Sequence, residues 1–509
     1  MHHGVNWGVI LERNAKKYRN KIALIFEDRK FTYGELFELI NMTANFLIGR
    51  GVEKGHRVCL YLPNCWEYFV CHFGVLRAGA AIVPFNVMYK SRELNYMIND
   101  SGAETIITTS ELYPNVAAIK ETTKLRNVIL IDANEEDELS LEAIYREPRE
   151  LIKNIPLNER EDLSLLQYTS GTTGEPKGAM LTYHNILSTI RTLVSVNATH
   201  DSDTTLSVLP MFHSFGIFTI YSSVFSGGTV VLVRRFDAEL VLTLIDRYNV
   251  TLFNGVPTML ISFINTPNLG RFKMKSLRYC VFGGAIVPLE VLDKFKILTN
   301  VTAVDGYGLT EAYGVIMTPY EGVYRHGSIG IPMPHVEVRV VDDNDKEVAV
   351  GEVGEIVIQG PNVMKGYWNK PAETEEAKRG GWFHTGDLGR KDEDGYYYIA
   401  GRKKDMIIAS GFNIYPKEIE EVLYKHEKVA DAAVIGIKHG YKGETVKACV
   451  VLKTGEDATP EEIIAYCRST LASFKVPTVV EFMDELPRNA AGKVLKRVLQ
   501  EEAAKNERS

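Results

Sequence analysis

A short stretch rich in hydroxyl and glycine residues, YTSGTTGEPKG, occupies residues 168–178. It follows an apolar run, LSLLQY, that predicts a strand, and it contains a single lysine, Lys177. Backbone N–H groups and hydroxyls gathered at the end of a strand can point at phosphate oxygens, and a lysine adds positive charge. These residue types favour the binding of a phosphate group, although a flexible surface loop has a similar composition.

The spacing of this loop differs from that of the common nucleotide-binding loop, GxxxxGK[ST]. Lys177 is followed by Gly178, so the hydroxyl that contacts magnesium in that motif is missing here. Gly174 lies three residues before the lysine rather than directly before it. An ordinary kinase or P-loop NTPase is therefore disfavoured.

Six further motifs follow the loop along the chain, and the set is more specific than any one of them. They are LPMFHSFG (209–216), GGA (283–285), DGYGLTEA (305–312), HTGD (384–387), GRKKDMIIASGFNIYPKEIE (401–420) and LPRNAAGKVLKR (486–497). In these motifs and in their order the chain resembles the adenylate-forming (ANL) superfamily of acyl-CoA synthetases, luciferases and peptide-synthetase adenylation domains. The resemblance spans essentially the whole chain, and it is greatest to medium- and long-chain fatty acid CoA ligases.

The resemblance implies an ATP-dependent acyl-CoA synthetase with two half-reactions. A carboxylic acid, expected to be a fatty acid, reacts with ATP to give acyl-AMP, and coenzyme A then displaces AMP. Joining two anions requires neutralisation of charge around the α-phosphate, which hydroxyls, a lysine and Mg²⁺ can supply. The residues implied as phosphate-loop and nucleotide contacts are Thr169, Ser170, Gly171, Thr172, Thr173, Gly174, Lys177, Gly283, Gly284, Ala285, Asp305, Gly306 and Gly308.

The motif DGYGLTEA implies three roles at neighbouring positions. Tyr307 would stack on adenine, and Thr310 would bond the α-phosphate. Glu311 would hold magnesium, a hard cation that suits one carboxylate together with phosphate oxygens. An isolated tyrosine more often packs in a core, but its place beside Thr-Glu in this motif favours the nucleotide.

The motif HTGD implies that Asp387 binds the ribose, assisted by Arg402. An ionised carboxylate can accept hydrogen bonds from both ribose hydroxyls, at about 1.5 to 3 kcal/mol per charged hydrogen bond. The alternative is that Asp387 is an ordinary turn residue, since aspartate is common in turns.

The remaining implied roles belong to four residues spread over the chain. Lys493, in a glycine-containing loop before the last helix, would bridge the carboxylate and the α-phosphate, whereas a lone lysine near a terminus is usually a solvated charge. His213 would position the carboxylate, with a core histidine as the alternative. Gly411 would leave space for the pantetheine arm of coenzyme A, although it could equally be a turn residue. Lys404 would be the hinge between two domains, where the alternative is an exposed linker lysine.

The elements that must position these residues fall into two domains. Over about the first 300 residues, β-branched runs alternate with amphipathic helical patterns, which predicts an α/β fold of doubly wound, parallel sheets. Such sheets bind ligands at the carboxyl ends of their strands, where the motif loops lie. From about Gly327 the pattern changes to a β-rich subdomain. We expect a large domain over residues 1–401 and a small, mobile α+β domain over residues 402–509.

Composition excludes several other classes. The chain has 509 residues and a formal net charge of −7 without a long basic block, which argues against general binding of nucleic acid. Six cysteines without a CxxC pair favour a reducing, cytoplasmic location, and no signal-peptide pattern is present at the start. The apolar region from Phe215 contains Ser-Ser and Ser-Gly-Gly, so it predicts two core elements rather than a membrane span.

Several functional alternatives share parts of this pattern. An aryl-CoA ligase of the coumarate ligase type and a luciferase-like adenylating oxygenase would carry similar motifs. A peptide-synthetase module would continue into a carrier domain, whereas the printed sequence ends at Ser509. A nucleotide-binding sensor would need neither Lys493 nor Glu311. The sequence leaves open the chain length of the acid, peripheral membrane contact and the oligomeric state, a homodimer included.

Overall fold

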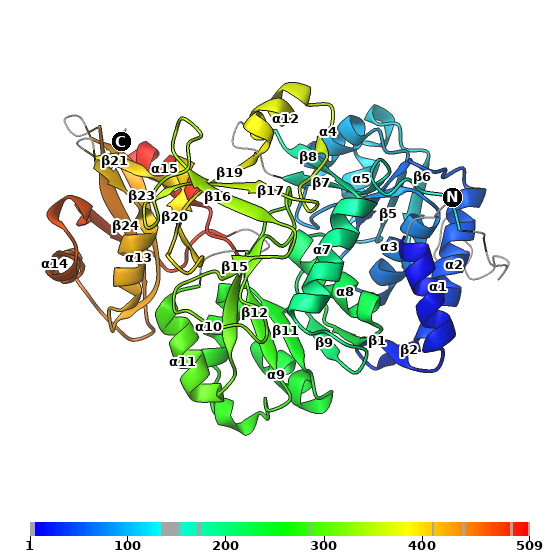
Figure 1. Cartoon of the computed structure of the whole chain (residues 1–509), viewed down its shortest axis with the longest axis horizontal. Coiled ribbons are helices and arrows are strands. Elements are labelled where there is room, and N and C mark those ends of the chain that lie inside the picture. The colour runs from blue at the N-terminus through cyan, green and yellow to red at the C-terminus, as the bar shows by residue number, and fades with distance from the viewer. Residues whose placement is uncertain are drawn as a thin grey trace.

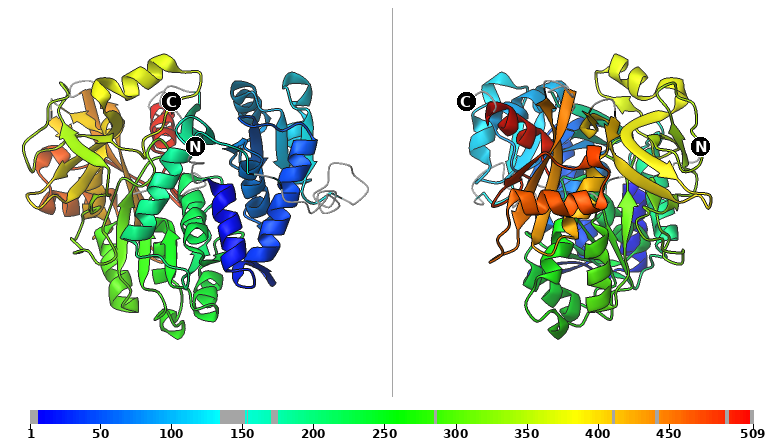
Figure 2. Two further views of the ribbon diagram at one scale, coloured as in Figure 1. Left: turned by 45° about the vertical axis from the view of Figure 1, so that its right-hand side comes forward. Right: turned by 90° about the vertical axis from the view of Figure 1, so that its left-hand side faces the viewer.

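The computed structural model describes residues 6–133, 152, 154–169, 175–284, 287–409, 412–439, 443–488 and 492–506. The first helices and strands lie at one end of the molecule, and the C-terminal elements lie at the other (Figure 1). When the molecule is turned by 90°, the C-terminal elements face the viewer in front of the large domain (Figure 2). The predicted architecture of a large α/β domain and a small C-terminal one is confirmed.

The larger of two sheets in the large domain runs in the order β15-β14-β13-β12-β11-β9-β10-β1-β2. Its six central strands are parallel, and antiparallel strands lie at both edges. The strands are β1 (Ile22–Phe26), β2 (Arg29–Thr32), β9 (Thr204–Ser207), β10 (Thr229–Leu232), β11 (Leu252–Gly255), β12 (Tyr279–Phe282), β13 (Ala303–Tyr307), β14 (Ile316–Met317) and β15 (Ile331–Pro332).

The second sheet of the large domain runs in the order β18-β8-β7-β4-β3-β5-β6, with a parallel centre from β7 to β6. The hydroxyl-rich loop joins its antiparallel strands β7 and β8, as the apolar run before it predicted. The strands are β3 (Arg57–Tyr61), β4 (Ala81–Pro84), β5 (Thr105–Thr108), β6 (Asn127–Leu130), β7 (Leu163–Thr169), β8 (Lys177–Thr182) and β18 (Gly366–Tyr367).

Helices of the large domain pack against both sheets, and one continuous apolar core includes residues from α1, α3, α7 and α8. Thr32 and Thr182 form capping boxes that fix the starts of α2 and α7. The helices are α1 (Trp7–Lys17), α2 (Tyr33–Gly49), α3 (Trp66–Arg77), α4 (Ser91–Ser101), α5 (Tyr113–Ala117), α7 (Tyr183–Val196), α8 (Ser214–Ser226), α9 (Ala238–Arg247), α10 (Pro257–Ile264), α11 (Leu289–Thr299) and α12 (Pro371–Ala377).

The β-rich subdomain predicted after Gly327 is a four-stranded antiparallel sheet in the order β16-β17-β19-β20. A turn at Asp394 and Gly395 joins its last two strands, and Asp-Gly is a common sequence in such hairpin turns. The strands are β16 (Glu337–Val341), β17 (Gly354–Gln359), β19 (Phe383–Lys391) and β20 (Tyr397–Arg402). Because β20 ends at Arg402, the domain boundary proposed at residues 401 and 402 falls at the end of this sheet.

The C-terminal domain has apolar clusters of its own, centred on β23 and β24. Pro416 and Pro460 begin two of its helices, a position where proline loses no helical hydrogen bond. Its last helix begins at Lys496, so Lys493 lies just before it, outside the helix. The elements are β21 (Ile407–Ala409), β22 (Phe412–Ile414), α13 (Pro416–Tyr424), β23 (Val429–His439), β24 (Gly443–Leu452), α14 (Pro460–Thr470), β25 (Val479–Phe482) and α15 (Lys496–Asn506).

The most apolar region of the sequence forms α8 and β10, joined by a turn at Gly227 and Gly228, and α8 lies in the core. Within the described ranges, no helix combines the length and the apolar character needed to cross a membrane. All six cysteines are buried as free thiols.

Candidate active site

An ion pair between a buried carboxylate and a partly exposed arginine links the last two strands of the β-rich sheet. Asp387 of β19 and Arg402 of β20 lie directly opposite each other in the strand register. Arg402 Nε lies 3.0 Å from Asp387 Oδ1, and Asp387 is only 4% exposed. Burial alone would lower the pKa of Arg402, but the charge of Asp387 raises it above its usual range. Strand pairing therefore brings together the two residues that the sequence assigned to the ribose.

Tyr307, the last residue of β13, reaches the same carboxylate from the large sheet. Its hydroxyl donates a hydrogen bond of 2.8 Å to Asp387 Oδ2. Burial raises the pKa of Tyr307 well above its usual value, and the neighbouring charge of Asp387 adds to this effect. A carboxylate can accept about four hydrogen bonds, so Asp387 keeps capacity for a ligand beside Arg402 and Tyr307.

The loop that carries Lys493 lies against the large domain. A side-chain carbon added at Gly492 would lie 2.9 Å from Thr258 Oγ1, at the start of α10. Burial, followed by the charge of Arg402, lowers the pKa of the Lys493 ammonium to about 8, while the charge of Asp387 opposes this shift. Lys493 is therefore within electrostatic reach of the Asp387–Arg402 pair, although it belongs to the other domain.

His213 lies at the start of α8, where its Nδ1 accepts a hydrogen bond of 3.3 Å from the backbone N–H of Phe215. Burial lowers the pKa of His213 to about 4, and the charge of Lys493 lowers it further. The imidazole is therefore neutral near pH 7. Because Nδ1 is the acceptor, the proton is assigned to Nε2, which leaves a hydrogen-bond donor rather than a cation at this position.

Thr169 and Lys177 flank the phosphate loop and pair with each other across β7 and β8. Thr169 Oγ1 lies 3.4 Å from Glu311 Oε1, which also accepts a hydrogen bond of 3.0 Å from the hydroxyl of Tyr367. Five predicted residues of the loop lie outside the described residues, as do two other predicted site residues: Ser170, Gly171, Thr172, Thr173, Gly174, Ala285 and Gly411.

Glu311 is the carboxylate that the sequence assigned to magnesium. Only hydroxyls contact it among the described residues, where no lysine or arginine forms an ion pair with it. The part of the chain that the structure describes contains no group of three or more His, Cys, Asp or Glu residues suited to a metal. Glu311 therefore fits a cation that takes most of its ligands from phosphate oxygens and water, as Mg²⁺ does.

The glycine positions of the motifs bring backbone segments close together. A side-chain carbon at Gly283 would lie 2.9 Å from the carbonyl oxygen of Gly306, and one at Gly308 would lie 2.9 Å from the backbone nitrogen of Gly314. Asp305 is buried nearby, and burial raises the pKa of its carboxyl to about 7. These contacts explain why small residues are needed where β12 and β13 end.

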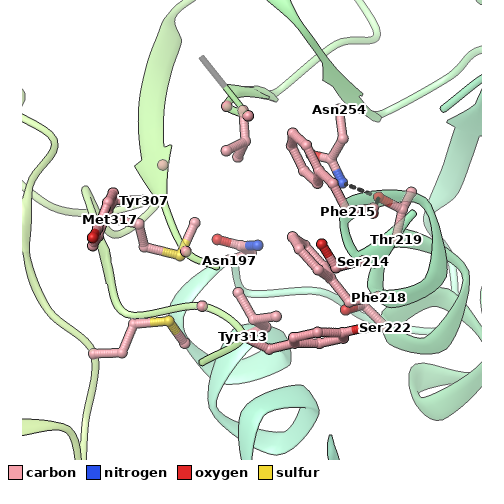
Figure 3. A pocket seen from close by; sticks show the side chains of 18 of the residues that line it. Asn197, Ser214, Phe215, Phe218, Thr219, Ser222, Asn254, Tyr307, Tyr313 and Met317 are labelled. Atoms are coloured by element: carbon pink, nitrogen blue, oxygen red, sulfur yellow. Dashed lines mark hydrogen bonds between the residues drawn. The ribbon is translucent and has the colours of Figure 1, made fainter. Parts of the chain in front are cut away.

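A cavity extends from this point along α8 and the large sheet. Figure 3 shows Phe215, Phe218 and Ser222 on the face of α8 that lines it, with Asn254 and Tyr313 on other walls. His213, Gly283 and Tyr307 also line the cavity, so it opens toward the residues assigned to the nucleotide. Its apolar walls come mainly from Leu193, Phe215, Phe218, Leu252, Val281, Leu309, Ile316, Met317 and Met333.

Sequence reasoning missed several of these neighbours. Tyr367, which bonds Glu311, is one of two aromatic residues in an ordinary GYW stretch. Thr258, which the loop of Lys493 touches, lies in no motif. The cavity residues come from α7, α8 and five strands, so no local spacing marks them as one group. Lys404 lies in a short 3₁₀ turn after β20 and is exposed, in keeping with either of its two interpretations.

A family model described as AMP-binding enzyme matches residues 11–368. The chain belongs to this family. A second family model, AMP-binding enzyme C-terminal domain, matches residues 418–493. The resemblance to adenylate-forming enzymes is confirmed, and so is the acyl-CoA ligase class of reaction, with ATP and coenzyme A as substrates.

Relatives along nearly the whole chain include two classes of ligase. Long-chain-fatty-acid–CoA ligase of Bacillus subtilis (strain 168) is 38% identical over 528 residues, covering 98% of this chain and 94% of the relative. Feruloyl-CoA synthase of an Amycolatopsis species is 38% identical over 488 residues, covering 95% of this chain and 96% of the relative.

Among solved structures, the ATP-bound form of MatB from Rhodopseudomonas palustris superposes with a TM-score of 0.91 at 33% identity, covering 98% of this chain and 99% of that one. The apo form of the same protein superposes with a lower TM-score of 0.81. The structure of this chain as a whole is therefore more similar to the ATP-bound form.

Proposed function

We propose that this enzyme is an ATP-dependent fatty acid–CoA ligase whose described arrangement is the one that forms acyl-AMP. The observation that carries the proposal is the location of Lys493. Its half-buried side chain lies within electrostatic reach both of His213, at the end of the cavity, and of the Asp387–Arg402 pair. A carboxylate in the cavity and the α-phosphate of ATP would meet at this point.

In the first half-reaction, one oxygen of the carboxylate forms a bond to the α-phosphorus. The bond from that phosphorus to the oxygen leading to the β-phosphate breaks, and pyrophosphate leaves with the electron pair. Lys493 and the hydroxyl of Thr310 would stabilise the negative charge that develops on the α-phosphate oxygens. The neutral His213 would donate through Nε2 to the carboxylate and so orient it without holding it too tightly by charge.

Asp387 and Arg402 would hold the ribose, and Tyr307 would cover the adenine ring while its hydroxyl stays bonded to Asp387. Thr169 and Lys177 would contact the outer phosphates together with the loop between them. Glu311 would hold Mg²⁺, which supplies positive charge to the phosphates when it is bound.

In the second half-reaction, the thiol sulfur of coenzyme A forms a bond to the acyl carbon while the bond from that carbon to AMP oxygen breaks. AMP leaves, and the thiol proton passes to solvent. Lys493 covers the site in the described arrangement, so the thiol needs a different one. We propose that residues 402–509 move as a unit about Lys404, which would let the segment near Gly411 approach the acyl-AMP.

The mostly apolar cavity supports a fatty acid as the substrate, and so does the similarity to long-chain-fatty-acid–CoA ligases. The equally identical feruloyl-CoA synthase makes an aryl acid the second candidate. A screen for pyrophosphate release with ATP would separate the two, using short, medium, long-chain and aromatic acids with and without coenzyme A. Release with aromatic acids alone would overturn the fatty acid proposal, and light emission with a luciferin would indicate an oxygenase.

A further inference from the structure

One end of the cavity is polar although most of its wall is apolar. Three residues that stand side by side in the strand register, Thr205, Leu252 and Tyr279, form the floor at the amino-terminal ends of β9, β11 and β12. Asn197, Thr199 and Ser222 line the cavity as well. Asn197 and Thr199 lie in the segment that leads into β9, and Ser222 lies near the end of α8. We call Asn197, Thr199, Thr205 and Ser222 the distal group.

The distal group lacks hydrogen-bond partners within the protein. Across the described ranges, none of its four side chains forms a hydrogen bond, and Asn197 Oδ1 is fully buried without a partner. The amide of Asn197 extends into the cavity opposite the face of α8 (Figure 3). Buried polar atoms are normally paired, so the unpaired Oδ1 of Asn197, together with three unpaired hydroxyls that line the same space, indicates a polar occupant.

Several polar groups elsewhere on the cavity wall are paired within the protein. Asn254 donates a hydrogen bond of 2.9 Å to Thr219 Oγ1, and the hydroxyl of Tyr279 donates to the backbone carbonyl of Thr318. Among the described residues, Ser214 and Nε2 of His213 keep hydrogen-bonding capacity at the opposite end, where we propose that the carboxylate lies. The distal group gathers four side chains with available hydrogen-bonding capacity at the other end of the cavity.

The backbone that presents two members of the distal group adopts an unusual conformation. Ala198, between Asn197 and Thr199, has a φ of 46°, in the left-handed region that residues with a side chain rarely adopt. Arg278 holds this turn by donating to the carbonyl oxygen of Ala198 at 2.9 Å, and its Nη2 lies 2.7 Å from Asp203. An unfavourable conformation that surrounding contacts enforce is typical of binding sites.

The distance from the distal group to the reacting carboxylate follows from the strands and from α8. Tyr279 and Gly283 both line the cavity and are four residues apart on β12 and the loop after it, which corresponds to about 13 Å. Phe215 and Ser222 are seven residues apart on α8, which corresponds to about 10.5 Å. An extended chain advances about 1.25 Å per carbon–carbon bond, so eight to ten bonds span the cavity.

We propose that the distal group binds a hydroxyl on the far end of the acid, so that the preferred substrate is a hydroxylated fatty acid about ten carbons long. This inference rests on the proposed function, because it takes the carboxylate to lie beside Lys493 and His213. A plain alkyl end would cover the four polar side chains without giving them partners. A hydroxyl would both donate to Asn197 Oδ1 and accept from a neighbouring hydroxyl.

The test compares two acids of equal length, 10-hydroxydecanoate and undecanoate, by the kcat/KM for pyrophosphate release with saturating ATP. We expect the wild-type enzyme to prefer the hydroxy acid by at least about tenfold, because a site built for a hydroxyl rejects the analogue that lacks it. Asn197→Leu should abolish or reverse this preference. Thr205→Val keeps the shape of the side chain and removes one hydroxyl, so it should also lower the preference for the hydroxy acid. This variant tests the inference if Asn197→Leu does not fold.

The control is Ser195→Ala, an exposed position on α7, which should leave the preference unchanged. A wild-type preference for undecanoate would overturn the inference while keeping the fatty acid function. So would a preference for the hydroxy acid that survives both Asn197→Leu and Thr205→Val. Failure of the enzyme to activate any straight-chain acid would instead overturn the proposed function together with the inference.

Discussion

The two ends of the active site treat their polar groups in opposite ways. At the nucleotide end, Asp387 is already bonded to Arg402 and Tyr307, and these three residues come from two sheets. At the distal end of the cavity, Asn197 and its polar neighbours have no partner among the described residues. The nucleotide end is charged and fixed in advance, whereas the distal end is neutral and left unsatisfied.

The difference fits what we propose that each end binds. A nucleotide carries several charges, and prearranged charged groups bind it without reorganisation at the moment of reaction. The end that recognises the acid works by accepting some acids and rejecting others, and unpaired polar groups reject apolar chains effectively. Changes at the first end should therefore alter the reaction for every acid, and changes at the second should alter only the choice among acids.

The largest effect is expected from substitution of Lys493, which we propose lies between the nucleotide and the acid. Lys493→Ala should slow formation of acyl-AMP about a thousandfold for all acids, because the charge that it adds to the α-phosphate is lost. The conversion of added acyl-AMP to acyl-CoA should stay within a fewfold of the parent. Pyrophosphate release and thioester formation would be measured separately. Lys505→Ala, an exposed lysine on α15, is the control, and equal losses in both half-reactions would contradict the role.

A smaller effect is expected from substitution of Lys404, the proposed hinge about which the C-terminal domain moves. Lys404→Pro fixes φ near −65° and should slow transfer to coenzyme A about a hundredfold, since misplacement of reacting groups by about 1 Å costs as much. Acyl-AMP should then accumulate on the enzyme, which quenched single-turnover assays would detect. Lys404→Ala keeps the backbone free and should behave like the parent. Parental rates in the proline variant would move the hinge elsewhere.

The next effect concerns the ribose contact of the nucleotide end. Asp387→Ala should raise the KM for ATP about 10- to 100-fold, because a charged hydrogen bond contributes about 1.5 to 3 kcal/mol. The variant should also discriminate less than the parent against 2′-deoxy-ATP, and its preference among acids should not change. Asp345→Ala removes an exposed carboxylate of the same sheet region and is the control. Unchanged discrimination would remove Asp387 from the ribose site.

The last prediction concerns how the activity depends on pH through the charge of Lys493. The pKa of Lys493 is lowered to about 8, so its positive charge is lost as the pH rises through that value. The kcat/KM for ATP should therefore fall about tenfold per pH unit above pH 8, since this parameter reports the free enzyme. His213, with a pKa of about 4, stays neutral over this range and adds no step. A profile that stays flat to pH 10 would contradict the shifted lysine.

Much of the fold could be predicted from local patterns. The alternation of strands and helices predicted the parallel sheets, and the change of pattern near Gly327 predicted the β-rich sheet of β16, β17, β19 and β20. Lys493 was predicted to lie in a loop before the last helix, and that helix begins at Lys496. In the structure Val494 forms a bridge with Arg488, a contact that no local pattern reveals.

The sequence by itself determined the family and the class of reaction, and it predicted the charged residues proposed to serve it, because motifs such as DGYGLTEA and HTGD keep these residues at fixed short spacings. Only the tertiary structure decided that Tyr307 bonds Asp387 with Lys493 within electrostatic reach, and that Asn197, Thr205 and Ser222 share one cavity end. The physical reason is that residues at the same level of neighbouring parallel strands lie side by side, although they are far apart along the chain. Their separation in the sequence therefore does not reveal that they are neighbours.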